Sequence, residues 1–294
     1  MCFTRPTLFR GRSPLLVIAL IGAAFAAGCG APPNDELAVV AGSTHIEVIL
    51  EDLAGDWITI HSLFPPATCP SQFDMKPSHI AALRDSRAVF LHPWQEAMAN
   101  VREGLNTANT PGERVHILAI ENNWMIPDVQ QTATARIAAL LDELMESDAP
   151  ESAPDAHARL EERSERIAGK AREAAVRLEA ANAEDAPVLC NIMQADFLEW
   201  AGFEIAGTYN APEDLSVAAI ERLLATGKEA GVVLVADNLQ SGDPRAGARI
   251  AQELGAGHAV LSNFPRAVPD TETWEATFEH NIEALAKALE TAEP

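Results

Sequence analysis

The sequence predicts an α/β protein of two lobes, each a parallel sheet flanked by helices. The lobes are joined by one long linking helix, and a ligand cleft lies between them. Short apolar runs alternate with amphipathic stretches in both halves of the chain, which is typical of parallel strands joined by right-handed crossovers. Residues 155–183 interrupt this alternation, because they are rich in Ala, Glu, Arg and Leu and contain no strand signal. The interruption separates the two lobes.

The first lobe is predicted from residue 37 onward. Its apolar runs are short enough for strands buried in a sheet, and each is followed by a stretch with helical spacing. We expect strands at 37–41, 57–61, 88–91 and 116–120. We expect helices at 44–53, 78–84, 94–107 and 127–146.

The linking helix and the second lobe follow. Glu–Arg pairs three or four residues apart favour one long, mostly exposed helix over 155–183. The segment SDAPESAPD breaks the chain before this helix, and Pro187 follows it. The strand–helix rhythm then resumes without a sequence repeat. We expect strands at 188–192, 204–208, 232–236 and 259–261, and helices at 195–201, 216–226, 244–254 and 271–290.

The N-terminus predicts export and anchoring. Basic residues precede the apolar run LLVIALIGAAFAA, which has signal-peptide length and is too short to span a bilayer comfortably. The run ends in Ala-Ala-Gly-Cys29, an arrangement that resembles a bacterial lipobox, in which the cysteine becomes lipid-modified. We therefore expect an extracytoplasmic protein that is lipid-anchored at Cys29. The alternative is a plain secretory signal with a chance cysteine.

These boundaries define the expected organisation of the chain. Residues 1–28 are a lipoprotein signal peptide and 29–36 a flexible tether. The remainder comprises an N-terminal lobe at 37–150, the linking helix within 151–186 and a C-terminal lobe at 187–294.

The charge balance limits the partners. The chain carries 43 Asp and Glu against 21 Lys and Arg. Nucleic acid is excluded as a partner, because phosphate contacts need clustered basic side chains. After loss of the signal peptide, Cys69 and Cys190 are left beside Cys29. They either pair or remain separate buried thiols, since spacing alone does not tell whether their Cα atoms approach.

Polar side chains recur at the ends of the predicted strands. In open α/β sheets, ligands bind beyond the carboxyl ends of the strands, so these side chains are candidates for the cleft. His92 comes straight after a strand and is the best ligand candidate among the histidines. The other candidates that follow strands are His61, Cys69, Gln72, Asp74, Asn122, Asn123, Trp124, Gln194, Asp237, Asn238 and Asn263.

Several segments together resemble the zinc/manganese-type metal solute-binding lipoproteins of bacterial ABC importers. SLFPPATCPSQFDMKPSHIAALRDSRAVFLH is similar to the family's Pro-rich turn, ligand and helix start. NNWMIPDVQQTATARIAALL, NIMQADFLEWAGFEIAGTY and VVLVADNLQSG resemble its further ligand segments. The resemblance spans roughly 37–290, and the long helix agrees with the family's rigid connecting helix. It implies a divalent metal ion as cargo, zinc or manganese, and a membrane permease as partner.

The resemblance also shows where this chain departs from the family. The family presents three histidines and one carboxylate. Here those positions fall at Gln72, at Asn122 or Asn123, at Gln194 and at Asp237. With His92 in support, these residues form the expected metal site, and His61, Cys69, Asp74, Trp124, Asn238 and Asn263 its surroundings. Amide oxygens suit Mn²⁺, Ca²⁺ or Mg²⁺ better than Zn²⁺, which favours imidazole and thiolate.

The expected function is therefore non-enzymatic. The chain lacks G-x-S-x-G, a phosphate-binding G-x-x-x-x-G-K, H-E-x-x-H and C-x-x-C. We expect the monomeric solute-binding component of an ABC importer, which delivers a metal to a permease. One alternative is a binder of a metal chelate or a small polar organic ligand. Others are a lipoprotein with a vestigial cleft and a hydrolase using Cys69 with a histidine.

Overall fold

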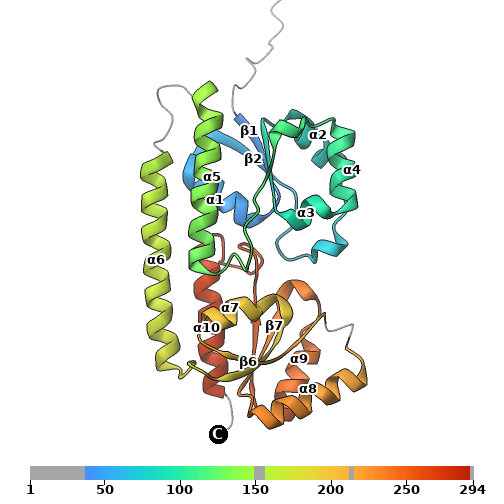
Figure 1. The fold of residues 1–294 in the computed structure, drawn as a ribbon, viewed down its shortest axis with the longest axis vertical. Coiled ribbons are helices and arrows are strands. Elements are labelled where there is room, and N and C mark those ends of the chain that lie inside the picture. Colours follow the sequence, from blue (N-terminus) through green and yellow to red (C-terminus); the bar gives the residue numbers. More distant parts are fainter. Residues whose placement is uncertain (1–36, 149–155, 212–214, 292–294) are drawn as a thin grey trace, which may run out of the picture. The chain divides into compact units, whose positions relative to one another are not determined.

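The computed structural model describes residues 37–148, 156–211 and 215–291, which fall within one compact unit that spans Glu36–Pro294. These residues form two parallel four-stranded sheets, one in each lobe, with helices on their faces (Figure 1). The two-lobe α/β fold expected from the sequence is confirmed. The predicted signal peptide, Cys29 and the tether lie outside the described residues.

The N-terminal lobe is built on the strand order β2-β1-β3-β4. All neighbouring strands are parallel, and the apolar side chains of β1 and β3 lie largely buried between helical layers. Its strands are β1 (Leu37–Ala41), β2 (Ile58–Ser62), β3 (Ala88–Leu91) and β4 (Val115–Ile117). Its helices are α1 (Thr44–Ala54), α2 (Pro77–Asp85), α3 (Pro93–Ala97), α4 (Ala99–Ala108) and α5 (Pro127–Asp148).

The C-terminal lobe repeats this topology with the order β6-β5-β7-β8. A shared order of second, first, third and fourth strand explains why the two halves have the same sequence rhythm. Its strands are β5 (Pro187–Asn191), β6 (Glu204–Tyr209), β7 (Leu234–Asn238) and β8 (Gly257–Leu261). Its helices are α7 (Ala195–Trp200), α8 (Val217–Ala230), α9 (Arg245–Leu254) and α10 (Trp274–Thr291).

The predicted linking helix is α6 (Ala156–Ala180). It runs beside α5 of the first lobe and α10 of the second (Figure 1). The helix is less exposed than its composition suggests, because several side chains along one face are buried. Arg163 is buried against α5 and α1 of the N-terminal lobe, whereas Ile167, Ala174 and Leu178 belong to the apolar cluster that is built mainly from the C-terminal lobe. The guanidinium of Arg163 bonds Thr134 of α5 and pairs with Asp52 of α1.

One predicted helix is broken in two. The stretch 94–107 is expected to be continuous, but Met98 adopts an extended backbone between α3 and α4. Pro93 at the first position and Gln95, whose side chain accepts from the His92 backbone N–H, define α3 as a separate turn. The break places the start of α3 directly after the end of β3.

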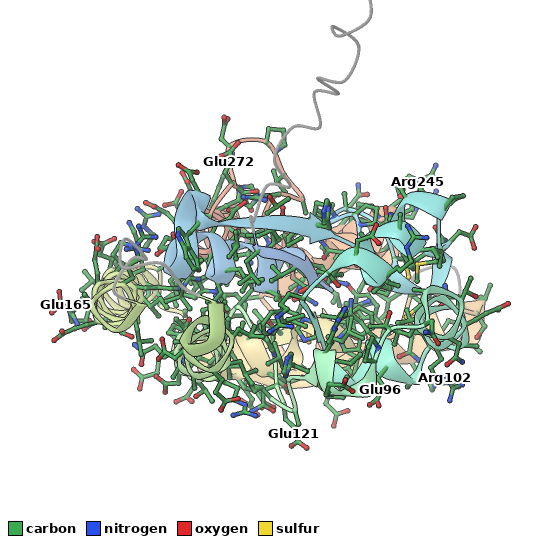
Figure 2. The ribbon with its side chains drawn as sticks, turned by 90° about the horizontal axis from the view of Figure 1, so that it is seen from above. Glu96, Arg102, Glu121, Glu165, Arg245 and Glu272 are labelled. Carbon is green, nitrogen blue, oxygen red and sulfur yellow. The ribbon has the colours of Figure 1, made fainter. Side chains whose placement is uncertain are left out.

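Two further features bear on function. Cys69 and Cys190 do not form a disulfide, and no helix among the described residues is long and apolar enough to cross a membrane. Acidic side chains project outward on several elements, and Glu96, Glu121, Glu165 and Glu272 are examples (Figure 2). The acidity of the sequence is therefore carried at least in part by its surface.

Candidate functional site between the lobes

Two buried histidines lie where the first lobe meets the second. His92 follows β3 and is 4% exposed, and His45 lies in the first turn of α1 and is 2% exposed. Both rings pack against Trp124, with ring centroids 4.3 and 5.8 Å away. Burial lowers the pKa of each imidazole to about 3, so both rings are neutral at physiological pH. A neutral imidazole is the form that binds metals.

The hydrogen bond of His45 fixes its tautomer. Its Nε2 lies 2.5 Å from the backbone oxygen of Asn263, in the loop after β8. A carbonyl oxygen only accepts, so Nε2 carries the proton and Nδ1 holds a lone pair. Among the described residues, this buried Nδ1 has no hydrogen-bond partner. Such an atom costs roughly 1–3 kcal/mol unless something binds it.

The side chain of Asn263 joins the two lobes at the same place. Its Oδ1 accepts from Asn123 Nδ2 of the first lobe at 2.8 Å and from Gln194 Nε2 of the second at 3.0 Å. The amide nitrogens of Asn123 and Asn263 both donate to the backbone oxygen of Met193. Asn123 also accepts from the Met125 backbone N–H, which fixes its orientation. Amides from two lobes and three loops therefore form one network.

Gln194 is the most deeply buried member of this network. It ends the short helical turn after β5 and is fully buried. Its Nε2 also donates to Asn238 Oδ1 at 2.9 Å, while its Oε1 has no partner among the described residues. Like His45 Nδ1, this oxygen is an electron-pair donor left unused inside the protein.

Further bonds tie the lobes around the network. Thr44 Oγ1 donates to the Pro265 oxygen at 2.9 Å, and Gln240 Nε2 donates to the Pro66 oxygen at 3.0 Å. Gln240 also binds Ser262 Oγ and accepts from the Asn263 backbone N–H. These contacts hold the loop after β8 against the N-terminal lobe.

Aromatic and apolar side chains surround the network. Trp124 is 5% exposed, whereas Trp94 stacks on the His92 ring at 5.6 Å and is 37% exposed. Ile192 and Met193, which precede Gln194, are also exposed. The buried polar centre is therefore flanked by both enclosed and accessible aromatic surface.

Asp237 lies elsewhere than its place in the sequence suggests. Its carboxylate accepts from Tyr209 Oη at 2.7 Å and binds His258 Nε2 at 2.7 Å. A Cβ on Gly247 of α9 would collide with it, so it points to the α9 face of the sheet. Side chains alternate along a strand, so Asn238, and not Asp237, reaches Gln194. Asp237, which we expected among the metal ligands, therefore points away from the side chains that meet between the lobes.

The remaining predicted residues do not join the network. Gln72 is exposed at the end of a short helical turn at Pro70–Gln72, and Asn122 is exposed with a left-handed backbone φ of 72°. His61 on β2 and Asp74 are also exposed, and Cys69 is half-buried. The structure thus brings together His92, Asn123, Trp124, Gln194, Asn238 and Asn263 and leaves the others outside.

Sequence reasoning missed His45 and its neighbour Ser43, whose Oγ lies 2.8 Å from His92 Nε2. Both lie in the loop and first helical turn after β1. The expectation that ligands gather beyond strand ends applies to this loop as well. A polar Ser-Thr-His run after the first strand was the available signal.

The donor set determines what the site can hold. No group of three or more His, Cys, Asp or Glu side chains able to hold a metal ion occurs in the part of the chain that the structure describes. The network instead offers imidazole nitrogen and amide oxygen. These are neutral ligands that bind cations without supplying negative charge.

The comparisons with known proteins agree with this architecture. The family model for zinc-uptake complex component A periplasmic proteins matches residues 39–288. A crystal structure of ZnuA superposes with a TM-score of 0.69 at 17% identity and covers 86% of this chain and 99% of its own. The Mn-bound periplasmic metal-binding protein from Candidatus Liberibacter asiaticus gives a TM-score of 0.70 at 12% identity, covering 86% and 100%.

A third solved structure is a ZnuA deletion mutant with zinc bound, with a TM-score of 0.66 at 18% identity and coverage of 88% and 100%. None of the curated protein sequences matches. At these identities the solved structures show the fold, and the family follows from the match across most of the sequence. The resemblance drawn from the sequence is thus confirmed. This chain belongs to the family of zinc-uptake complex component A periplasmic proteins, which are solute-binding proteins and not enzymes.

Proposed function

We propose that this protein is the extracytoplasmic solute-binding component of an ABC importer. It binds a divalent metal of the zinc/manganese class between its lobes and delivers it to a membrane permease. Cys29 anchors the monomeric protein to the membrane through lipid. The family match supports the kind of cargo and partner.

One observation supports the proposed position of the metal. Four buried side-chain atoms have no partner among the described residues, and two of them, His45 Nδ1 of the first lobe and Gln194 Oε1 of the second, lie at the junction of the lobes, whereas Ser62 Oγ and His116 Nε2 lie on β2 and β4. The side chains of His45 and Gln194 bond the same residue, Asn263. Buried polar atoms in folded proteins are nearly always satisfied, so unsatisfied ones call for a ligand. Imidazole nitrogen and amide oxygen are both metal ligands.

The assigned roles follow from the contacts. His45 and Gln194 hold the cargo directly, with His92 and Asn123 beside them. Asn238 and Asn263 orient the amide of Gln194, and Trp124 packs against both imidazoles. Gln72 and Asn122 are exposed on the first lobe and lie outside the network. They can act as ligands only in a different conformation that brings them to it.

Thermal unfolding tests the proposal. A soluble form of residues 30–294 is stripped with chelator and titrated with Zn²⁺, Mn²⁺, Fe²⁺, Ca²⁺ and Mg²⁺. A ligand at about 100 times its dissociation constant adds roughly 2.7 kcal/mol of stability. We expect selective stabilisation by one metal, added as the ion or as its neutral complex with L-histidine, reduced in His45→Phe and retained in His61→Ala, whose imidazole is exposed on β2. A shift that His45→Phe leaves intact would place the metal elsewhere.

A further inference from the structure

The centre between the lobes carries no formal charge. His45 and His92 are both buried, and the hydrogen bond from His45 Nε2 to the Asn263 backbone oxygen leaves a lone pair on His45 Nδ1. The other members of the centre are amides and hydroxyls, namely Asn123, Gln194, Asn238, Asn263, Ser43 and Ser262. A cation placed among these groups finds lone pairs but no counter-charge.

The nearby carboxylates are engaged away from this centre. Asp237 is satisfied by Tyr209 and His258 on the α9 face of its sheet. Glu47 and Glu51 of α1 pair with Arg266, and Asp52 pairs with Arg163 and Arg166. Glu121, next to Asn122, is exposed and points outward (Figure 2). The acidic side chains of α1 and β7 are therefore held by partners of their own.

This arrangement disfavours a bare dication. Removing an ion from water is costly, and only paired charge or several strong ligands offsets the loss. An anionic cargo is disfavoured as well, since the chain has a net charge of −22 that repels it. A metal whose charge is already cancelled by its own ligands avoids both the cost of desolvating a bare dication and the repulsion of an anion by the acidic protein.

The network also offers what the organic part of such a complex needs. Asn123 and Asn263 are partly exposed, and both direct amide N–H groups at the Met193 oxygen, at 3.1 and 3.3 Å. Amide N–H groups bind carboxylate oxygens of a chelator when they are released from this carbonyl. Trp94, 37% exposed and stacked on His92, offers an aromatic face beside them.

We propose that the cargo is a metal chelate of zero net charge, recognised by the neutral amide and imidazole groups between the lobes, and not the bare ion. This inference rests on the proposed function, because it names the form in which the metal is bound. His45 Nδ1 and Gln194 Oε1 contact the complex, and Asn123 and Asn263 bind its carboxylates.

Calorimetry with three probes tests the inference on residues 30–294, which contain the compact unit Glu36–Pro294. The probes are Zn²⁺ in a non-coordinating buffer, the neutral zinc complex of two L-histidine anions, and L-histidine alone. We expect the complex to bind at least tenfold more tightly than Zn²⁺ and L-histidine alone to bind weakly.

The outcomes separate the two proposals. Tight binding of Zn²⁺ that excess L-histidine weakens would overturn the chelate inference and leave the metal-importer function standing. If neither Zn²⁺ nor its complex binds, and Mn²⁺ and its L-histidine complex also fail, both proposals are wrong. Binding of L-histidine as tight as that of the complex would assign an organic ligand and overturn both.

A charge-adding variant gives an independent test. Asn123→Asp places a carboxylate at the partly exposed rim of the network. We expect it to raise the affinity for Zn²⁺ alone at least tenfold and to erase the preference for the complex. Asp74→Asn, at an exposed position outside the network, is the matched charge-changing control and should alter neither affinity. An unchanged preference in Asn123→Asp, with an unfolding temperature like that of the parent, would contradict the inference.

Discussion

The molecule buries two polar centres that differ in how they are completed. Within the C-terminal lobe, the carboxylate of Asp237 is bonded by Tyr209 and His258, so its charge has local partners. Between the lobes, the centre contains no carboxylate among the described residues, and it leaves His45 Nδ1 and Gln194 Oε1 without partners there. A buried polar group that is fully satisfied contributes to stability, whereas one that is left unsatisfied favours binding. The comparison therefore supports our proposal that the neutral centre binds the ligand, and it gives the buried acid bonding partners within its own lobe.

The pKa of Tyr209 agrees with a structural role for the first centre. Burial raises this pKa well above its ordinary value, and the neighbouring Asp237 carboxylate acts in the same direction. The phenol therefore stays protonated and donates to Asp237. In contrast, the pKa values of His45 and His92 are lowered, which keeps their lone pairs available.

The largest expected effect is a loss of stability in acid that arises from the two histidines between the lobes. The folded pKa of His45 and of His92 is about 3, below the ordinary value of 6.5. The unfolded chain therefore binds more protons below pH 6.5, and stability is lost as pH falls from 6.5 towards 3. Each histidine contributes up to about 1.4 kcal/mol per pH unit in this range. Urea unfolding at several pH values measures the slope, and His45→Phe should reduce it by that amount.

The reference for this measurement is His61→Phe, since His61 is exposed. Its slope should equal that of the parent protein. If His45→Phe has the same slope of stability against pH as the parent protein, His45 accepts protons in the folded state. The two polar centres would then not differ in the way described.

Removing the buried acid should damage the fold and spare the ligand. Asp237→Ala deletes two hydrogen bonds to a charged group, and bonds of this kind contribute about 1.5–3 kcal/mol each. We expect the free energy of unfolding to fall by about 3–6 kcal/mol, with ligand affinity unchanged, as measured by urea unfolding and calorimetry. Tyr209→Phe removes one of these bonds and should lose about half as much. Lost affinity at unchanged stability would return Asp237 to the binding site.

Disturbing the neutral centre should do the opposite. His45→Phe keeps the ring contacts with Trp124 and Phe264 but removes both nitrogens. We expect ligand affinity to fall about tenfold, equivalent to about 1.4 kcal/mol, while stability at neutral pH stays nearly constant or rises. A ligand-binding isotherm and a melting curve on the same sample separate the two effects.

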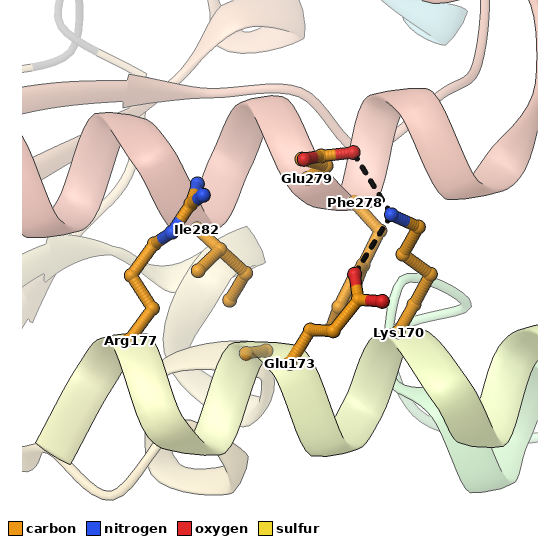
Figure 3. A pocket seen from close by; sticks show the side chains of 7 residues that line it. Lys170, Glu173, Arg177, Phe278, Glu279 and Ile282 are labelled. Carbon is orange, nitrogen blue, oxygen red and sulfur yellow. Dashed lines mark hydrogen bonds and ion pairs between the residues drawn. The ribbon is translucent and has the colours of Figure 1, made fainter.

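The smallest effect is expected at the surface between the linking helix and the second lobe. There Lys170 of α6 lies between Glu173 of the same helix and Glu279 of α10, beside a small pocket over Phe278 and Ile282 (Figure 3). Exposed ion pairs contribute little and are screened by salt. Lys170→Met should shift the unfolding temperature by at most about 3 °C, and the shift should shrink in about 1 M NaCl. A larger shift that is insensitive to salt would show that this contact is a main source of stability between α6 and α10.

The sequence alone determined the fold class, most of the strands and the linking helix. Continuous apolar runs define β1 and β3, because strands buried on both faces need apolar side chains throughout. The strand-free, Ala- and Glu-rich segment defined α6 to within a few residues at each end. The placement of His92, Gln194 and Asn263 at strand ends was likewise readable, since parallel strands direct their carboxyl ends to one edge.

Only the tertiary structure decided which of these side chains meet. Val235 and Asp237 share one face of β7, whereas Leu234, Ala236 and Asn238 share the other, so a shift of one residue exchanges an acid for an amide at the interface. His45 joins the candidate site because the loop after β8 places the Asn263 carbonyl within hydrogen-bond distance of its ring. Such contacts join residues far apart in the sequence, and local periodicity does not encode them, because they depend on how the two lobes pack.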